Sequence, residues 1–469
     1  MGTIKETDTG TETTAGTQAA AGTQTTAGTD ADDKRTSLEL VDFIRRSPSM
    51  FHTVRTIEGY LAEAGFTRLA ETDAWRVEPG GRYYTTRNGS SVVAWKVGES
   101  LDGYHFQVAA SHSDSPTFKV KSVPELVGPD EYLRLNVEAY GGMLDRTWFD
   151  RPLSLAGRVL VRDGARIESR LFSPDRDLAL IPSVAIHFDR DANKGVATNR
   201  QVDLCPLVSA GRLGRGDFRR MVSAELGVEP DQLLAYDLFL VNRQPASVWG
   251  WRDEFVSAPK LDDLQCAFSS LKAFLAAEND HDVSVFACFD NEEVGSLTKQ
   301  GAMSTLLKDV LRRTNAALGR TEEDLHRALA GSFLVSCDNA HAVHPNHPEK
   351  TDDANKAHLN AGPVIKEAAN QKYTTDAQSR AVLEAVCDAA GVPHQTFANR
   401  SDSAGGSTLG NLSNVQVSMR AADLGLPQLA MHSSYETGGV RDTAFAIRAL
   451  EGFYRTNLLF DGQGDVTLA

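Results

Sequence analysis

The chain has 469 residues, a formal net charge of −15 and a sequence pI near 5.3. Nucleic acids and anionic membranes reward clustered Lys and Arg side chains, so this acidic balance argues against either as a partner. No stretch approaches the roughly 20 apolar residues needed to cross a bilayer, and the N-terminus lacks the basic and apolar regions of a signal peptide. A chain of this length can form two or three domains without disulfides.

The five cysteines are widely spaced and include no CxxC pair. Most of them lie inside apolar stretches such as VFACFD, which is typical of buried, reduced thiols. We therefore expect a cytoplasmic protein without disulfides. The five residues are Cys205, Cys266, Cys288, Cys337 and Cys387.

The N-terminal region divides into a tail and a helical segment. Residues 1–34 consist almost wholly of Thr, Ala, Gly, Gln and Asp, and such a segment cannot offset its ordering entropy, so we expect a disordered tail. From Ser37 apolar residues recur with the helical period, are interrupted near Pro48 and resume from Phe51 to Leu61. This pattern predicts two helices.

The next segments have strand character. The runs SVVAWKV and HFQVAAS predict strands that lead into the turn SHSDSP. Residues 117–254 contain alternating segments around Asp163-Gly164, a two-residue hairpin signal. We expect this stretch to form an inserted, mainly β domain.

After Pro259 helical and strand patterns alternate. LDDLQCAFSSLKAFLAA predicts a helix, VSVFACF a buried strand, EEVGS the start of another helical region, and FLVSC and LPQLAM further strands. This is the order of an α/β fold. We expect a three-layer α/β/α domain, built discontinuously from residues 35–116 and 255–469.

Five short segments place metal-binding residue types beside these hydrophobic runs: SHSDSP, KLDDL, DNEEVGS, SCDNAH and AMHSS. Two imidazoles with three or four carboxylates suit a pair of divalent cations that share one carboxylate, which predicts a hydrolase. The candidate residues are His112, Asp262, Glu292, Glu293, Asp338 and His432.

His112 and Asp114 are two residues apart, so an extended backbone sends both side chains to one face. Asp114 could then orient a metal-bound imidazole. The alternative is a strand-end histidine that is hydrogen-bonded within a turn.

Acidic pairs follow at two places. Asp262 and Asp263 begin a helix, where either could instead cap the helix, and their spacing does not decide which one bridges two metals. Glu292 and Glu293 diverge after a buried strand, so one should ligate while the other takes a proton from the attacking water and gives it to the leaving amine. The alternative for this second pair is an exposed acidic turn.

Asp338 and His432 follow apolar strands, where each needs a partner. That partner could be a helix terminus for the carboxylate, and the histidine could be a satisfied core residue. The run AHAVHPNHP adds three histidines, but Pro345 and Pro348 exclude a regular helix that would align them, so we expect a shaped loop.

Taken together, these motifs resemble the aspartyl aminopeptidases, a family of cytosolic dinuclear zinc exopeptidases. The resemblance covers about residues 36–455. Its most specific pieces are ASHSDSPTFKVK, TWFDRPLSLAGRV, IPSVAIHFDR, PKLDDLQCAF, FDNEEVGS, SCDNAHAVHPN, GPVIK, NQKY and LAMHS.

The resemblance assigns roles residue by residue. It implies that His112 and Asp338 complete one zinc site and Glu293 and His432 the other, with Asp262 bridging and followed by a cis peptide bond. It makes Glu292 the general base, and Asp114 joins it as a candidate catalytic residue. It places His187 of one subunit in the active site of a neighbour, and His341, Lys366 and Tyr373 around the first residue of the peptide.

The chemistry of Lys366 agrees with the role that the resemblance implies, because an acidic substrate side chain needs a fixed cation in a half-buried pocket. Without the resemblance, Lys366 would be interpreted as an ordinary solvated lysine. Two departures from the family pattern, LDD for LDN and HSSYE for a segment containing Arg, could broaden the specificity. The Thr-rich tail also lies outside that pattern.

We therefore expect an aminopeptidase that removes unblocked N-terminal residues, preferably Asp or Glu, with two Zn ions per subunit or Mn or Co in their place. The resemblance implies subunits that pair through the insert and assemble into a tetrahedral dodecamer. One alternative is an N-acyl amino acid deacylase or carboxypeptidase on the same metal centre. Another is a self-assembling scaffold without catalysis.

Overall fold

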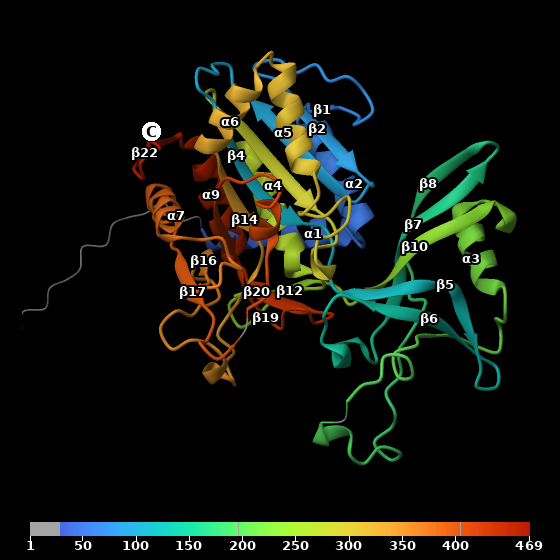
Figure 1. Cartoon of the computed structure of the whole chain (residues 1–469). Coiled ribbons are helices and arrows are strands. Elements are labelled where there is room, and N and C mark those ends of the chain that lie inside the picture. Colours follow the sequence, from blue (N-terminus) through green and yellow to red (C-terminus); the bar gives the residue numbers. More distant parts are fainter. Residues whose placement is uncertain (1–28, 196, 404) are drawn as a thin grey trace, which may run out of the picture.

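The computed structural model describes residues 29–195, 197–403 and 405–469 (Figure 1). In this part of the chain, nine strands form a mixed central sheet in which β13, β4, β14 and β18 run parallel to one another. Strand β13 lies between β3 and β4, although it follows them by more than 170 residues. The sheet order is β1 (Thr67–Arg68), β2 (Arg82–Arg87), β3 (Ser91–Val97), β13 (Val283–Phe289), β4 (Phe106–His112), β14 (Phe333–Cys337), β18 (Arg420–Gly425), β16 (Val364–Glu367) and β17 (Gln395–Ala398).

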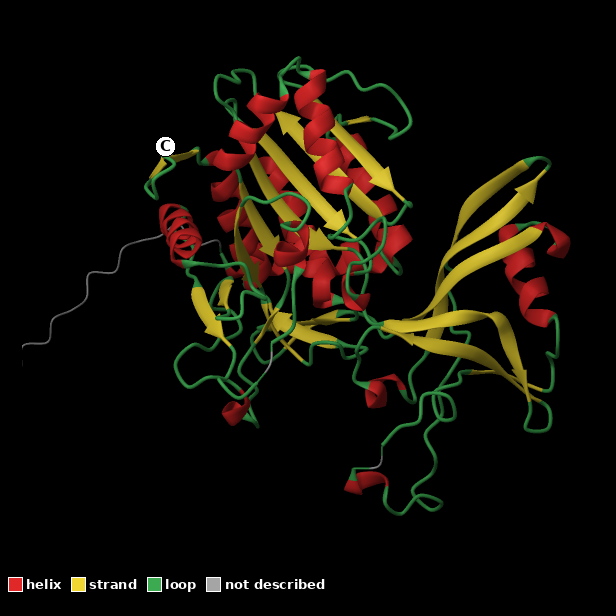
Figure 2. Cartoon of the chain, viewed as in Figure 1, coloured by secondary structure: helices red, strands yellow, loops and turns green. Residues whose placement is uncertain are grey.

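Helices cover both faces of this sheet (Figure 2). One apolar core contains side chains of α1 (Asp30–Arg46), α2 (Met50–Glu63), α4 (Leu261–Ala276), α7 (Ala377–Ala389) and α9 (Asp442–Arg455). The other contains side chains of α5 (Leu306–Ala317), α6 (Glu322–Gly331) and α8 (Leu409–Ser413). The expected three-layer α/β/α arrangement is confirmed.

Strand β13 explains why the central strands appear in the sequence as continuous apolar runs. Phe286 and Cys288 belong to one core, whereas Val285 and Ala287 belong to the other. Because both faces are buried, both sets are mainly apolar, and only Ser284 of this strand is polar. A mixed sheet that helices cover on both faces agrees with this pattern.

A separate six-stranded antiparallel sheet forms a second lobe with its own apolar core (Figure 1). Its strands all come from residues 117–242, and the hairpin expected at Asp163-Gly164 joins two of them. The extent of the inserted domain stays a prediction. The elements are β8 (Arg166–Phe172), β7 (Leu153–Asp163), β10 (Leu233–Asn242), β5 (Thr117–Val127), β6 (Tyr132–Tyr140) and β9 (Leu207–Ala210), with α3 (Asp217–Leu226).

Two smaller sheets were not predicted. A five-stranded sheet joins segments from both sides of the predicted boundary at residue 254, and a hairpin of β21 (Leu458–Phe460) and β22 (Val466–Leu468) ends the chain. The five strands are β11 (Ser247–Trp249), β12 (Phe255–Ala258), β20 (Glu436–Gly439), β19 (Pro427–Leu429) and β15 (Ala340–His341). The 3₁₀ helices are η1 (Asp145–Trp148), η2 (Ala192–Lys194), η3 (Pro230–Gln232), η4 (Glu292–Val294) and η5 (Pro348–Lys350).

Some predicted boundaries differ from the structure. Helix α1 begins at Asp30, because the Thr29 hydroxyl caps it by accepting from the Asp32 backbone N–H, so residues 30–34 are helical rather than tail. The remainder of the predicted tail, residues 1–28, lies outside the described residues. The strand expected in LPQLAM is the short β19 of the five-stranded sheet, not a strand of the central sheet.

All five cysteines are buried and unpaired, as expected for reduced thiols. In the part of the chain that the structure describes, no helix is both long enough and apolar enough to cross a bilayer.

Candidate metal centre

Acids and imidazoles converge from five separate segments next to the central sheet. His112 ends β4, and Asp338 directly follows β14. Glu292 and Glu293 begin η4, just past β13. The parallel strands β4, β13 and β14 all point their carboxyl ends at this place, which is where ligands collect in open α/β sheets. Asp262 at the start of α4 and His432 after β19 complete the group.

Asp262 lies between the two histidines, and each of its carboxylate oxygens faces a different ring. Oδ1 lies 3.3 Å from His112 Nε2, and Oδ2 lies 3.5 Å from His432 Nε2. His432 Nε2 also lies 3.4 Å from Glu293 Oε2. With zinc–ligand distances of about 2.0–2.2 Å, two ligands of one tetrahedral zinc lie about 3.3–3.5 Å apart. The spacing of these donor atoms therefore fits two zinc sites that share Asp262.

Buried carboxylate oxygens without partners also fit a pair of cations. Among the described residues, Asp262 Oδ1, Asp263 Oδ1 and Glu293 Oε1 are buried and accept no hydrogen bond. An uncompensated buried carboxylate is costly, so these oxygens require a positive partner. Burial, followed by the charge of nearby acids, raises the pKa of Glu293 well above its usual value and that of Glu292 to about 8. Cations would remove this repulsion.

Asp262 and Asp263, which the sequence could not tell apart, differ in their surroundings. Asp262 faces both imidazoles, whereas Asp263 Oδ2 accepts a hydrogen bond from the backbone N–H of His112 at 3.1 Å. The peptide bond between them is cis, as the resemblance implied.

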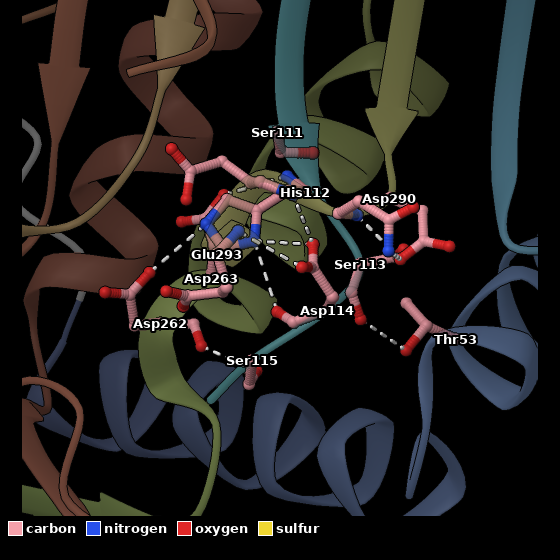
Figure 3. Close-up of polar contacts among 12 residues, drawn as sticks. Thr53, Ser111, His112, Ser113, Asp114, Ser115, Asp262, Asp263, Asp290 and Glu293 are labelled. Carbon is pink, nitrogen blue, oxygen red and sulfur yellow. Dashed lines mark hydrogen bonds and ion pairs between the residues drawn. The ribbon is translucent and has the colours of Figure 1, made fainter. Parts of the chain in front are cut away.

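Asp114 contacts His112, Glu292 and Glu293, three residues of the centre (Figure 3). Its Oδ1 lies 3.4 Å from His112 Nδ1. The same ring nitrogen lies 3.1 Å from the Asp114 carbonyl oxygen. Its carboxylate accepts from the backbone N–H groups of Glu292 at 3.1 Å and Glu293 at 3.2 Å. Asp114 thus fixes one histidine and both glutamates, which agrees with the orienting role expected from the sequence.

A cavity of about 210 Å³ opens onto these residues. His341, Lys366 and Tyr373 line it together with Asp262, Glu292, Asp338 and His432. The structure therefore brings three of the four predicted substrate residues to the predicted ligands and the predicted base.

Comparison with known proteins decides the family. Residues 43–454 match the family model described as aminopeptidase I zinc metalloprotease (M18). A probable M18 family aminopeptidase 2 of Clostridium acetobutylicum is 42% identical over 422 residues, which cover 89% of this chain and 98% of that protein. The chain belongs to the M18 family of zinc aminopeptidases.

Solved structures agree with this family assignment. A chain of the Ape4 and Nbr1 complex, determined by cryo-EM, superposes with a TM-score of 0.87 at 35% identity and covers 90% of this chain and 86% of its own. A chain of the S. cerevisiae mApe1 dodecamer superposes with a TM-score of 0.81 at 29% identity, covering 90% of this chain and 97% of its own. The family resemblance seen in the motifs is confirmed.

Lys366 of this M18 aminopeptidase lines the cavity and is buried, with 2% of its surface exposed. Its Nζ donates to the backbone oxygens of Asp338 at 2.7 Å and Asn339 at 3.3 Å, and lies 5.2 Å from the centre of the Tyr373 ring. Burial lowers the pKa of Lys366, but the combined charge of neighbouring groups, chiefly the Asp338 carboxylate with Tyr373 and Asp423, outweighs burial, and the net pKa is raised. Lys366 is therefore a fixed cation beside the predicted ligands.

His187 is placed differently from the other predicted site residues. It is exposed in the long loop between β8 and β9, and it is not among the described residues that line the cavity. In Figure 1 this loop extends away from the central sheet. Within one chain, His187 does not reach the metal centre, and its proposed role depends on a neighbouring subunit.

Glu436 is a buried residue of the centre that sequence reasoning missed. Its Oε2 accepts from the backbone N–H of Asp262 at 3.0 Å, and its Oε1 from that of His432 at 2.7 Å. Only 1% of Glu436 is exposed. One carboxylate therefore holds two ligand-bearing segments of the M18 aminopeptidase together. Its place four residues after His432 was the only local signal.

Proposed function

We propose that this M18 aminopeptidase uses two zinc ions per subunit to remove unblocked N-terminal residues, preferably Asp or Glu, from peptides. The observation that carries the dinuclear centre is the placement of Asp262, with one oxygen toward each histidine. In this proposal Asp262 bridges the ions, His112 and Asp338 complete one site, and Glu293 and His432 complete the other. Mn or Co could substitute, because such ligands accept several divalent metals.

The chain's own residues supply binding and proton transfer. When bound, the zinc ions would supply Lewis-acid polarisation of the peptide carbonyl and lower the pKa of the attacking water. Glu292 lines the cavity and, unlike Glu293, has no imidazole of the ligand set as an ion-pair partner among the described residues. It is free to accept the proton of the attacking water and to pass it to the leaving amine. Asp114 holds the His112 ring and the backbone of Glu292 in position.

Lys366 supports a preference for acidic residues. An ammonium group has three N–H donors, and in the described structure two backbone oxygens occupy two of them. The third can donate to the carboxylate of an N-terminal Asp or Glu, and a charge-assisted hydrogen bond in a buried pocket is strong. His341 and Tyr373 complete the walls of this pocket.

The inserted six-stranded sheet is proposed as a dimerisation domain. Large apolar side chains are exposed on this sheet and on the long loop between β8 and β9, among them Ile167 of β8 at 61% and Phe188 of the loop at 88%. Phe188 adjoins His187, so a partner that covers this loop could receive His187 in its active site. We propose a tetrahedral dodecamer of such dimers in the cytoplasm, supported by the dodecameric mApe1 structure.

The proposal is tested by hydrolysis of matched peptides that begin with Asp, Glu, Leu or Ala, each with a free and an acetylated N-terminus. Wild type and Glu292→Gln are compared at measured zinc content, with Glu323→Gln as the control, since Glu323 is an exposed residue of α6. We expect fast turnover of free acidic peptides, a loss of roughly 10²–10⁴-fold in Glu292→Gln, and two zinc ions in every variant.

The alternatives predict other results. Equal turnover of acetylated substrates would indicate a deacylase, and release of C-terminal residues would indicate a carboxypeptidase. A fully metallated protein that assembles but turns over none of these substrates would indicate a scaffold.

A further inference from the structure

We propose that Tyr140, in the six-stranded sheet, is a positioning residue of the metal centre that acts through Asp114. Tyr140 ends β6, and its neighbour across the ladder is Thr117, three residues after Asp114. The inference rests on the proposed function, because it assigns Tyr140 to the same dinuclear site. It gives the inserted sheet a part in metal binding within its own subunit.

The hydrogen bond from Tyr140 has a fixed direction. Its Oη donates to Asp114 Oδ2 at 2.7 Å and accepts from Asn291 Nδ2 at 2.8 Å. The orientation of the Asn291 amide is set by its Nδ2, which also donates to Asp290 Oδ1 at 3.3 Å, while its Oδ1 accepts from the Thr298 hydroxyl and the Gln300 amide, each at 2.8 Å. The hydroxyl proton of Tyr140 therefore has to point at Asp114.

Asp114 Oδ2 depends on this donor. Its other hydrogen-bond donor in the described structure is the backbone N–H of Glu293, at the longer distance of 3.2 Å. The side chain of Asp114 is fully buried, so a lost donor would not be replaced readily by water. Because Asp114 also lies against His112 and holds the backbone of Glu292, a shift of its carboxylate would move both sides of the centre.

The backbone beside Tyr140 also touches the site. Gly141 has a φ of +81°, and a Cβ built there would lie 3.1 Å from the Cβ of Glu293. Tyr140 itself packs edge-on against Phe239 of β10, with ring centres 5.4 Å apart. The end of β6 is therefore held between Phe239, which packs with Met50 and Phe51 of α2, and a proposed ligand.

The segment after Tyr140 reaches the second histidine independently. The backbone N–H of Leu144 donates to the carbonyl oxygen of His432 at 3.0 Å. The Thr147 hydroxyl accepts from the backbone N–H of Ser434 at 2.9 Å, and the Ser434 hydroxyl donates to the Thr147 carbonyl at 2.6 Å. Residues 140–147 thus contact both the His112 side and the His432 side of the centre.

Tyr140→Phe tests the role of the hydroxyl, because the variant keeps the ring that packs on Phe239. Tyr236→Phe is the matched control, since Tyr236 also lies in the six-stranded sheet and its hydroxyl donates to the Lys121 carbonyl at 2.7 Å. Full-length wild type and both variants are compared for zinc dissociation constant by competition with a chromophoric chelator, for kcat and KM on an Asp peptide, and for melting temperature without zinc.

We expect Tyr140→Phe to bind zinc roughly 10-fold more weakly and to lose kcat by a similar factor, as for other groups that hold metal ligands. KM and the melting temperature of the zinc-free protein should match those of Tyr236→Phe. The inference is overturned if Tyr140→Phe has the zinc affinity of wild type, or if both variants weaken zinc binding equally. If wild type turns over no peptide, the proposed function fails, while zinc affinity still decides the role of Tyr140.

Discussion

The metal centre and the six-stranded sheet use burial in opposite ways. The centre buries acids that each have one oxygen without a hydrogen-bond partner in the described structure, such as Asp263 Oδ1 and Glu293 Oε1. The sheet exposes large apolar side chains, such as Ile167 on its edge strand β8 and Phe188 in the long loop. Buried charge requires a counter-charge, whereas exposed apolar surface favours a covering surface. We therefore expect the first region to bind cations and the second to bind another protein surface.

The strongest test of this difference removes the shared carboxylate. Asp262→Ala should lower the zinc content below two ions per subunit and reduce peptide turnover by more than the roughly 10–100-fold typical of lost supporting groups. The reason is that each of its oxygens faces a different histidine. Zinc content and kcat/KM of Asp262→Ala are compared with those of Asp231→Ala, because Asp231 is an exposed acid in η3. Two retained zinc ions in Asp262→Ala would contradict a shared ligand.

The second test concerns charge in the cavity rather than the metal ligands. Lys366→Met should reduce the ratio of kcat/KM for Asp peptides over Leu peptides by roughly 10–100-fold, the range of a hydrogen bond to a charged group. Two zinc ions should remain bound. The control is Lys308→Met, since Lys308 is an exposed residue of α5. An unchanged ratio would assign Lys366 to holding the backbone of Asp338 and Asn339 alone.

A smaller effect is expected from the carboxylate behind the centre. Glu436→Gln places an N–H donor where the wild type accepts from the backbone of Asp262 and His432. Zinc should bind roughly 10-fold more weakly. Competition with a chelator measures this change, with Glu323→Gln as the control. Wild-type affinity would show that the two segments are held by other contacts.

The smallest effect on chemistry and the clearest effect on assembly should come from the exposed loop. Phe188→Ser removes the most exposed of the apolar groups around His187. We expect smaller particles in analytical ultracentrifugation with zinc content unchanged. Val415→Ser, also exposed but beside α8 of the α/β/α layers, is the control and should assemble normally. Equal assembly of both variants would place the interface elsewhere.

Much of the fold could be predicted because the central strands are buried on both faces, and runs such as VSVFACF carry that signal by themselves. The five-stranded sheet could not, because strands of two to four residues, such as β15, carry no period. The boundary of α1 was set by a cap at Thr29 within a stretch that looked uniformly polar.

The same limit applies to the site. Candidate ligands could be predicted because each lies next to an apolar run, and the structure brings them together. Glu436 and Tyr140 were missed because their contacts join distant segments: 174 residues separate Glu436 from Asp262. Apart from the place of Glu436 four residues after His432, nothing in the sequence around either residue indicates its partner. Such residues emerge only once the chain is folded.

The position of β13 between β3 and β4 has a consequence for synthesis. A ribosome delivers β3 and β4 first, yet their common neighbour arrives only after the whole six-stranded sheet has emerged. His432 follows later still, near the end of the chain. No nascent fragment that lacks His432 can therefore assemble the complete set of proposed ligands. In the proposed mechanism, peptide-bond cleavage would begin only after His432 has been translated.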